Sequence, residues 1–259
     1  MYIMKNRFST FALSLIFASI GALSACGEAT ARQTTQAETQ SKAEIEAIVR
    51  AYILENPEII EEAIFALDRK RQGELILEGR KSLVTYKDEI ESDPRDFSLG
   101  PKDAKVTVVE FFDYNCGFCK RTTNWVKDMI EEYPNDIRFV FKELPVLDAR
   151  SQTSRNAARV ALAAARQGRY MDMHFALMNA RGLSETRVQA LAKELKLDID
   201  KLNKDMRDPA IEAQINDTLA LANRIPVLTG TPFFIINGDY VSGANMDELR
   251  GKLEAALKG

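Results

Sequence analysis

The chain has 259 residues, of which 46% are hydrophobic and 28% are charged, and its formal net charge at pH 7 is −3. This length and composition allow one sizeable core with a smaller accessory element, and they exclude a chain that is disordered throughout. Because the mildly acidic sequence holds no block of lysines or arginines, it also argues against nucleic acid as a partner.

Residues 1–25 have the pattern of a secretory signal peptide. Lys5 and Arg7 precede an apolar stretch, which is too short and too soon followed by polar residues to predict a permanent membrane helix. The stretch ends in the letters "LSAC" at Cys26, which resemble the lipobox of bacterial lipoproteins. We therefore expect export and a lipid anchor on Cys26. The alternative is an ordinary signal peptide, cut after Ala25 or Ala31, beside an incidental cysteine.

The next two stretches are predicted to be a tether and a helical region. Residues 26–41 are polar and lack an apolar period, which predicts a flexible tether. Residues 42–93 are predicted to be helical, because the capping-box letters "SKAE" are followed by apolar residues at helical spacing. A second helix is expected to begin at Pro57, and a third segment is expected over about 73–90.

Residues 94–259 change their periodicity and predict an α/β layer. The run "KVTVVEFFDY" from Lys105 is typical of a central strand, and a helix from about Cys116 to Tyr133 and a strand over "IRFVFKELP" should follow. Residues 150–223 are almost entirely helical in pattern. The hairpin signal Asn237-Gly238 and a closing helix over 245–258 complete the order. This order predicts a sheet with an inserted helical subdomain.

The pair Cys116 and Cys119 admits three chemistries. A zinc site needs four ligands, but the chain has one histidine, His174, and no second cysteine pair, so no metal site is predicted within the chain. We expect His174 to pack in the inserted subdomain. A structural disulfide would close a loop of a few residues, and short loops stabilise least. The third chemistry is thiol-disulfide exchange.

The position of the pair favours exchange. At a helix start, the Cys116 sulfur meets unpaired backbone N–H groups and the positive end of the helix dipole, which lower a thiol pKa. A shift of about two pKa units needs about 2.7 kcal/mol, more than a helix terminus supplies, so Lys120 and Arg121 are expected to contribute. We expect Cys116 to be the exposed nucleophile. Cys119, one turn later and more buried, would attack the mixed disulfide and release the partner.

These motifs resemble a known family. The letters "VVEFFDYNCGFC", a helical insertion and then "GTPFFIING" are similar to the DsbA-like branch of the thioredoxin superfamily. With "ILENPEII" upstream, the chain most resembles the suppressor-of-copper-sensitivity C type of periplasmic thiol-disulfide proteins. The resemblance implies a thioredoxin fold with an inserted helical subdomain and an N-terminal helical extension. It also implies a periplasmic location and a protein disulfide isomerase activity without a bound cofactor.

The resemblance also assigns individual positions. Thr231 and Pro232 match the residue and cis-proline that face the cysteines and present backbone to a bound peptide. Glu110 matches the buried acid that exchanges a proton with Cys119, with a pKa raised by desolvation. Gly117 and Phe118 stand where strong oxidases of the family carry proline and histidine. They are assigned to the substrate site, and they imply a less oxidising disulfide of the isomerase kind.

The helices of residues 42–93 raise the question of assembly. A helical hairpin with one apolar stripe is not stable alone at this length, so the stripe must be buried against another surface. That surface is either the catalytic domain of the same chain or the same region of neighbouring chains. The second is favoured, because these helices lie outside the minimal fold, and it predicts a homo-oligomer.

The resulting hypothesis is an exported thiol-disulfide oxidoreductase that isomerises or reduces disulfides in other exported proteins. A membrane redox partner of unknown identity is implied. One alternative is an oxidase of the DsbA type. Another is a copper-tolerance protein in which the two thiolates hold Cu(I), a soft metal that accepts low coordination.

Overall fold

The computed structural model describes residues 41–151 and 153–259. The predicted signal peptide, nearly all of the predicted tether and the predicted lipid site Cys26 lie outside the described residues. Within the described ranges, no helix combines the length and the apolar character needed to cross a membrane. The described residues divide into two units, one that ends at residue 60 and one that spans residues 61–259.

In the described part of the first unit, helix α1 (Lys42–Glu55) forms as predicted. Its capping box is complete, because the Glu44 carboxylate accepts the backbone N–H of Ser41 at 2.8 Å and Ser41 Oγ accepts the N–H of Glu44. None of the α1 side chains is buried. The helix therefore presents its apolar side chains to solvent in the single chain, among them Ile45, Ile48, Val49 and Tyr52.

Helix α2 (Glu58–Thr85) is continuous, so the predicted division into two segments near Gly73 is wrong. One glycine costs a helix only about 1 kcal/mol relative to alanine, and good helix formers flank Gly73 on both sides. A break occurs instead at Tyr86, after which α3 (Lys87–Glu91) begins. The last turns of α2 are packed, with Gly79, Ser82 and Leu83 buried.

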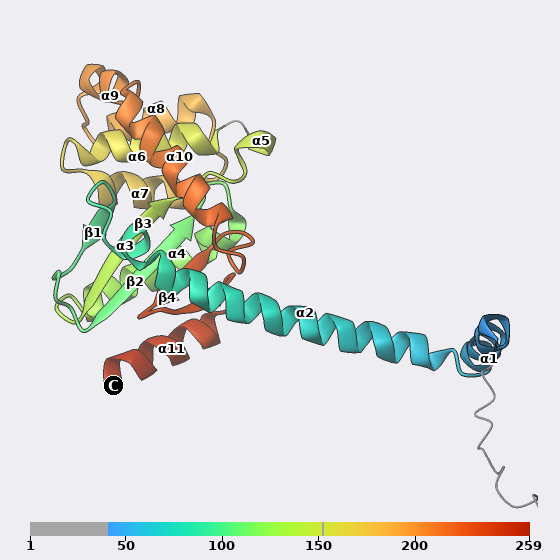
Figure 1. The fold of residues 1–259 in the computed structure, drawn as a ribbon. Helices are drawn as coiled ribbons and strands as arrows, with labels where there is room; N and C mark the ends of the chain where they lie inside the picture. Colours follow the sequence, from blue (N-terminus) through green and yellow to red (C-terminus); the bar gives the residue numbers. More distant parts are fainter. Residues whose placement is uncertain (1–40, 152) are drawn as a thin grey trace, which may run out of the picture. The chain divides into compact units, whose positions relative to one another are not determined.

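Five strands form one mixed sheet in the order β1-β3-β2-β4-β5 (Figure 1). Their bounds are β1 (Phe97–Leu99), β2 (Val106–Phe112), β3 (Ile137–Glu143), β4 (Phe233–Ile236) and β5 (Asp239–Ser242). The central strand β2 runs parallel to β3 and antiparallel to β4. The predicted hairpin turn is confirmed, since Asn237 and Gly238 have φ values of 47° and 85° between β4 and β5.

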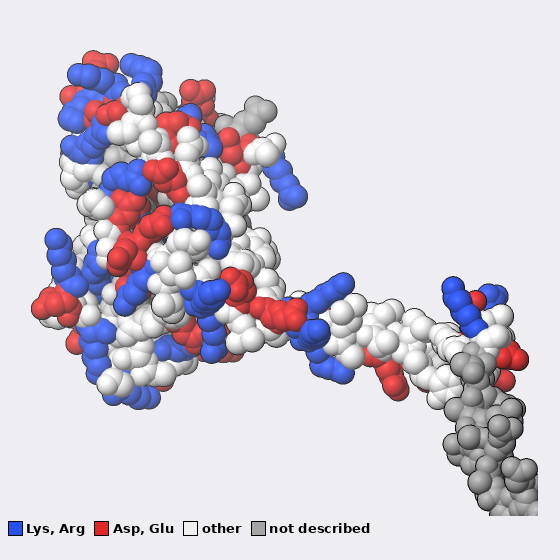
Figure 2. Space-filling view, viewed as in Figure 1, with Lys and Arg blue, Asp and Glu red and all other residues white. Residues whose placement is uncertain are grey.

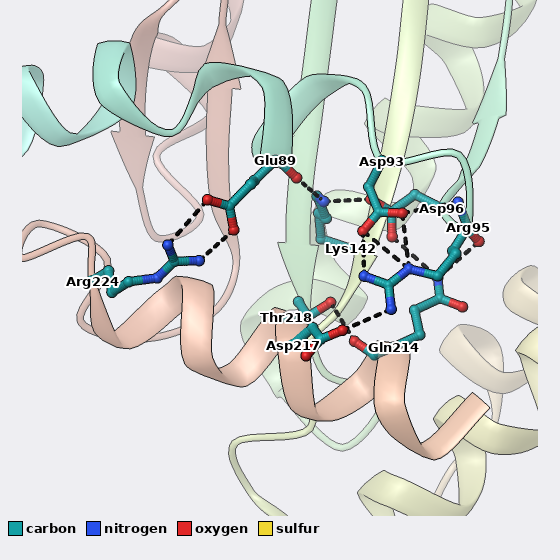
Figure 3. Close-up of polar contacts among 9 residues, drawn as sticks. All are labelled: Glu89, Asp93, Arg95, Asp96, Lys142, Gln214, Asp217, Thr218 and Arg224. Atoms are coloured by element: carbon teal, nitrogen blue, oxygen red, sulfur yellow. Dashed lines mark hydrogen bonds and ion pairs between the residues drawn. The ribbon is translucent and has the colours of Figure 1, made fainter. Parts of the chain in front are cut away.

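Strand β1 was not predicted, because three residues carry no usable period. A buried ion pair between Asp96, which directly precedes β1, and Lys142 of β3 holds the two strands together (Figure 3). The Lys142 ammonium also donates to the backbone carbonyl of Glu89 in α3. Gln214 of α10 donates to Asp96 Oδ1 at 3.1 Å. Tertiary contacts rather than local propensity therefore define this edge of the sheet.

The remaining helices follow the predicted order. Helix α4 joins β2 to β3, the helices α5 to α10 lie between β3 and β4 in sequence, and α11 closes the chain (Figure 1). Their bounds are α4 (Gly117–Glu132), α5 (Asp148–Ser151), α6 (Ser154–Ala165), α7 (Tyr170–Asn179), α8 (Glu185–Glu194), α9 (Ile199–Asp205), α10 (Pro209–Asn223) and α11 (Met246–Lys258). Helices α6 to α10 gather at one end of the sheet. The inserted helical subdomain is thus present.

The sheet has a hydrophobic core on each face. Val106, Val108 and Phe112 of β2 belong to the larger core, which also contains residues of α4, α6 and α7. Val109 and Phe111 belong to the second core, with residues from the end of α2, from α10 and from the segment after α10. Alternate β2 residues thus enter opposite cores, as expected for a central strand. On the face in Figure 2, positive and negative side chains are interspersed over residues 61–259.

Candidate active site

The loop after β2 places the cysteine pair. Asp113 Oδ1 accepts the N–H of Asn115 and the hydroxyl of Ser154, both at 2.8 Å. Its Oδ2 accepts the N–H of Leu147 at 2.8 Å. One buried carboxylate therefore fixes the loop to the start of α6 and to the segment after β3. Asp113 therefore shapes the loop that carries the cysteines.

Cys116 is the N-cap residue of α4, and its backbone carbonyl accepts the N–H of Lys120 at 3.1 Å. Cys116 and Cys119 are both free thiols. Cys116 is 7% exposed and Cys119 is 0% exposed. Cys119 is thus the more buried of the two, as predicted, but the expectation of an exposed Cys116 is wrong. The reason is the close approach of the Thr231 segment to its sulfur.

Thr231, the residue before Pro232, lies against Cys116, as the resemblance implied. The bond between Thr231 and Pro232 is cis, and the Cys116 sulfur donates to the Thr231 carbonyl oxygen at 3.1 Å. Strand β4 begins at the next residue, and its antiparallel pairing with β2 places Phe233 opposite Phe111. This register carries the turn before β4 to the end of β2, where the cysteine loop starts.

The pKa of the Cys116 thiol falls to about 5, from an ordinary value of 9.0. The largest cause is a hydrogen bond from Cys119, followed by the Thr231 side chain and the backbone N–H groups of Cys119 and Phe118. Burial opposes the shift. The Thr231 carbonyl accepts only from the protonated thiol, so it also favours the neutral form. The donors outweigh both effects, and the sulfur is ionised at neutral pH.

Lys120 and Arg121 are not the main causes of the lowered Cys116 pKa. The Lys120 ammonium donates to the carbonyls of Leu177, Met178 and Ala180 at 2.9–3.1 Å, so it binds the end of α7. The Arg121 guanidinium lies over the Phe118 ring, 4.4 Å from its centroid. The charge of Lys120 still interacts favourably with the Cys116 thiolate, in the predicted direction, but hydrogen bonds around the helix start are the larger causes.

Glu110 lies beneath the pair, on the central strand. It is 1% exposed, and its Oε1 accepts the Thr122 hydroxyl at 3.5 Å, whereas Oε2 has no hydrogen-bond partner. Burial raises its pKa to about 8. Burial, the hydrogen bond to Cys116 and the charge of Glu110 together raise the pKa of Cys119. The carboxyl is thus able to hold a proton at neutral pH close to a thiol that resists ionisation.

A groove of about 620 Å³ opens beside the Cys116 sulfur. Gly117, Phe118 and Thr231 line it, together with apolar side chains, Arg150 and Asn223. Phe118 is 56% exposed, and a side chain at Gly117 would meet only open space. An extended peptide thus has access to Gly117, Phe118 and Thr231 from this side.

A buried polar cluster beside the cysteine loop was not predicted. The hydroxyls of Tyr114 and Tyr170 both donate to Glu143 Oε1, at 2.9 and 2.8 Å, and Tyr114 lies 3.2 Å from His174 Nδ1. Burial lowers the pKa of His174 to about 3 and raises that of Glu143. His174 is therefore a neutral packing residue, as expected. The cluster joins α7 to the sheet and the loop.

The described residues contain no group of three or more His, Cys, Asp or Glu side chains able to hold a metal ion. The two thiols of Cys116 and Cys119 are the soft ligands at this site. They suit a two-coordinate Cu(I) ion, which stays a prediction.

Two family models match the chain. The model for the DSBA-like thioredoxin domain matches residues 107–254. The model for the copper resistance protein ScsC N-terminal domain matches residues 42–74. Among curated proteins, the chain is 31% identical over 167 residues to a Na(+)/H(+) antiporter NhaA 1 of Salinispora arenicola, covering 64% of this chain and 25% of that protein. The chain thus spans about a quarter of the length of the curated relatives it matches.

Solved structures resemble the chain over more of their length. A thioredoxin-like oxidoreductase from Silicibacter pomeroyi is 38% identical with a TM-score of 0.61, covering 66% of this chain and 98% of that one. The thiol-disulfide exchange protein alpha-DsbA2 from Wolbachia pipientis is 31% identical with a TM-score of 0.62, covering 68% and 95%. ScsC of Proteus mirabilis in a compact conformation is 29% identical with a TM-score of 0.61, covering 83% and 98%.

The fold, the cysteine pair at the start of α4 and these matches agree. The N-terminal match adds a ScsC-type segment ahead of the thioredoxin fold. The chain belongs to the DSBA-like thioredoxin domain family, whose members include thiol-disulfide exchange proteins.

Proposed function

We propose that the chain is an exported thiol-disulfide oxidoreductase that isomerises or reduces disulfides in other exported proteins. The observation that carries this proposal is the Cys116 sulfur, which has a pKa of about 5 and lies 3.1 Å from the Thr231 carbonyl beside an open groove. A thiolate is the attacking species in disulfide exchange, and the groove gives a peptide access to it.

In the proposed first step, the Cys116 thiolate attacks one sulfur of a substrate disulfide. The substrate S–S bond breaks, a mixed disulfide forms, and the other substrate sulfur leaves as a thiolate. In this proposal the substrate backbone lies along Thr231, and Gly117 and Phe118 line the same groove. If another substrate thiolate then attacks the mixed disulfide, Cys116 is released and the substrate is isomerised with no net oxidation.

Reduction uses Cys119 instead. The ionised form of Glu110 accepts the proton of Cys119, and the Cys119 thiolate attacks the Cys116 sulfur of the mixed disulfide. The bond between Cys116 and the substrate breaks, the substrate sulfur leaves as a thiolate, and the Cys116–Cys119 disulfide forms, so that the substrate gains two electrons. Burial keeps the pKa of Glu110 near 8, so this carboxyl is suited to exchange a proton near neutrality. A membrane redox partner would then return the pair to its thiol form.

The test is refolding of a protein with scrambled disulfides. The reduced chain should restore its activity, and the Cys116→Ala variant should lose that effect. The Cys119→Ala variant keeps the Cys116 sulfur but loses the hydrogen bond that lowers its pKa most, so it should retain a slower isomerisation and lose reduction. Full activity of Cys116→Ala would end the proposal.

One observation favours a second candidate, an oxidase of the DsbA type. A low thiol pKa stabilises the reduced form and so makes the disulfide more oxidising. Measurement of the reduction potential separates the two: a potential near those of strong oxidases, with fast oxidation of a reduced peptide, supports the oxidase. A lower potential with isomerisation of scrambled protein supports the first proposal.

Assembly and location complete the proposal. The exposed apolar side chains of α1 favour association with the same segment of other copies, which would bring several active sites to one substrate. We place the protein in the periplasm, anchored by lipid at Cys26. Mass spectrometry of the protein from the membrane fraction tests for the lipid on Cys26. Cell fractionation gives a second test, because a Cys26→Ala variant should appear in the soluble periplasmic fraction.

A further inference from the structure

Gly79 lies where the end of α2 meets the chain segment that leads to Pro232. It is buried inside a regular helix, a position where glycine is disfavoured unless packing requires it. A Cβ atom at Gly79 would lie 2.2 and 2.8 Å from the two methyl carbons of Val227 and 3.0 Å from its Cβ. The α2 backbone is therefore in direct contact with Val227. Gly73, in the same helix, has nothing within 4 Å of such an atom.

Val227 has little freedom to give way. It is 6% exposed and belongs to the second core, with Leu83 of α2 and Ile225. The Val227 Cβ itself would lie 3.0 Å from the added Cβ, and rotation about χ1 does not move it, so a new rotamer alone does not relieve the contact. Any group added at Gly79 must therefore move α2 or move the backbone around residue 227.

The backbone around residue 227 continues into the active site. The N–H of Leu228 donates to the carbonyl of Ile225 at 2.9 Å, and the N–H of Thr229 donates to the carbonyl of Val227 at 3.1 Å. Residues 228–231 then form one wall of the groove beside Cys116. A displacement of Val227 would thus reach Thr231 within four residues of tightly turned chain.

The start of this segment is tied to the same corner of α2 and α3. Arg224, which ends α10, donates to Glu89 of α3 at 3.0 Å, as Figure 3 shows. Its guanidinium also lies over the ring of Tyr86, the residue between α2 and α3, 4.4 Å from the centroid. Both Arg224 and Val227 are therefore positioned by the α2–α3 corner, upstream of the groove.

We infer that Gly79 is a positioning residue for the active site: by letting the α2 backbone rest on Val227, it sets where Thr231 and the groove wall lie relative to the Cys116 sulfur. This inference rests on the proposed function for its meaning in catalysis. Its structural part concerns only the placement of Thr231 against a thiol.

The test compares Gly79→Ala with Gly73→Ala, which makes the same exchange in the same helix where there is open space. Two quantities are measured on the reduced full chain: the pKa of Cys116, from the pH dependence of its alkylation, and the KM for a scrambled protein. We expect Gly79→Ala to raise the Cys116 pKa by about one unit, a tenfold loss of thiolate well below the pKa, and to raise KM with little change in kcat. Gly73→Ala should behave as the parent chain.

A compensating variant identifies the contact. Gly79→Ala combined with Val227→Ala removes the methyl groups that the new Cβ meets, so it should bring both quantities back toward the parent values. If Gly79→Ala does not fold, Val227→Ala alone decides, since loss of the two methyl groups frees the segment and should also raise the Cys116 pKa.

An unchanged Cys116 pKa and KM in a folded Gly79→Ala chain would overturn the inference, as would unchanged values in Val227→Ala when the glycine variant is unfolded. An effect of equal size in Gly73→Ala would also overturn it. The thiol titration needs no substrate. It therefore decides the placement of Thr231 even if the parent chain shows no isomerase activity.

Discussion

The Cys116 sulfur lies 3.1 Å from the carbonyl oxygen of Thr231, a residue 115 positions further along the chain. The pairing of β4 with β2 brings the two together, because the turn before β4 ends beside the loop after β2. Near the sulfur, the Thr231 carbonyl favours the thiol, whereas Cys119, the Thr231 side chain and the helix N–H groups favour the thiolate. The balance between these groups sets the reactivity of the site.

Removal of the Thr231 hydroxyl should make Cys116 more basic. A hydrogen bond to a charged group contributes about 1.5–3 kcal/mol, so Thr231→Val should raise the Cys116 pKa by about one to two units. The measurement is the pH dependence of thiolate absorbance in the reduced chain. Thr229→Val is the matched control, because Thr229 lines the same groove but is not among the groups that lower the Cys116 pKa. A Thr231→Val pKa equal to that of the control would contradict this account.

Exchange of Glu110 for an isosteric amide should slow the step that uses Cys119. Glu110→Gln has no group to accept the Cys119 proton, and proton transfer of this kind contributes about a hundredfold or more to a rate. We expect the mixed disulfide with a peptide to persist, which non-reducing electrophoresis measures. The rate at which Cys116 attacks the same peptide should stay unchanged. An equal loss of rate in the attack by Cys116 and in the attack by Cys119 would contradict a specific role of Glu110 in the second step.

Glu110 should also impose a pH dependence on stability. Its pKa is raised from 4.5 to about 8 in the fold, so the folded chain holds a proton that the unfolded chain has released between these values. The stabilising contribution of Glu110 is fully present below pH 4.5 and is lost as pH rises towards 8, by about 1.4 kcal/mol per pH unit.

The check is urea unfolding of the oxidised parent and the oxidised Glu110→Gln chain at several pH values. The difference between their unfolding free energies isolates this one carboxyl, because all other titrating groups are shared. Between pH 4.5 and 7, the unfolding free energy of the variant should rise relative to that of the parent by up to about 3 kcal/mol. A difference that does not depend on pH would mean that Glu110 titrates normally.

Much of this architecture was predictable from residues that act locally. The Asn237-Gly238 pair requires two positive φ values, and the turn forms there. Cys116 was expected at a helix start, and it is the N-cap of α4. The family resemblance added Thr231 and Pro232, which no local period would have placed beside a cysteine.

The features that were not predicted depend on contacts between distant residues. Strand β1 is held by the buried pair of Asp96 and Lys142, neither of which indicates a strand. Lys120 was expected to act on the thiolate because it follows Cys119 in sequence. In the structure, the end of α7 supplies three carbonyl groups that bind its ammonium. Nothing in the sequence around Lys120 reports that helix end.

Lys120 should therefore matter mainly for stability. Lys120→Met leaves three carbonyls without their donor, which should cost about 1–3 kcal/mol in the free energy of unfolding. Lys127→Met, which removes an exposed ion pair with Glu131, should change it by less than about 1 kcal/mol. Because the Lys120 charge also acts on the thiolate, the Cys116 pKa should rise by less than about one unit in Lys120→Met and stay the same in Lys127→Met. A rise of a full unit in Lys120→Met would restore the electrostatic role that we first expected.

A charge on α1 should test assembly. Val49 is 50% exposed and lies among apolar neighbours on this helix, so Val49→Asp should break association between copies while leaving each catalytic unit folded. Light scattering of the purified chain gives the mass. Lys42→Asp, at the polar start of the same helix, is the matched control and should keep the parent mass. A parent chain that is already monomeric would contradict the proposed oligomer.

Under the proposed function, the two edges of the sheet bear on contact with partly unfolded substrate proteins. An edge strand offers free backbone groups on which another chain can add a strand and aggregate. Here β1 has three residues and β5 has four. Lys252 also donates to the carbonyl of Tyr240 in β5 at 2.6 Å and pairs with Asp239 at 3.0 Å, which places a charge on that edge. Because both edge strands are short and one carries a charge, a misfolded substrate has little edge on which to add a strand. Under the proposed function, disulfide exchange at Cys116 can then proceed without aggregation of the substrate with the enzyme.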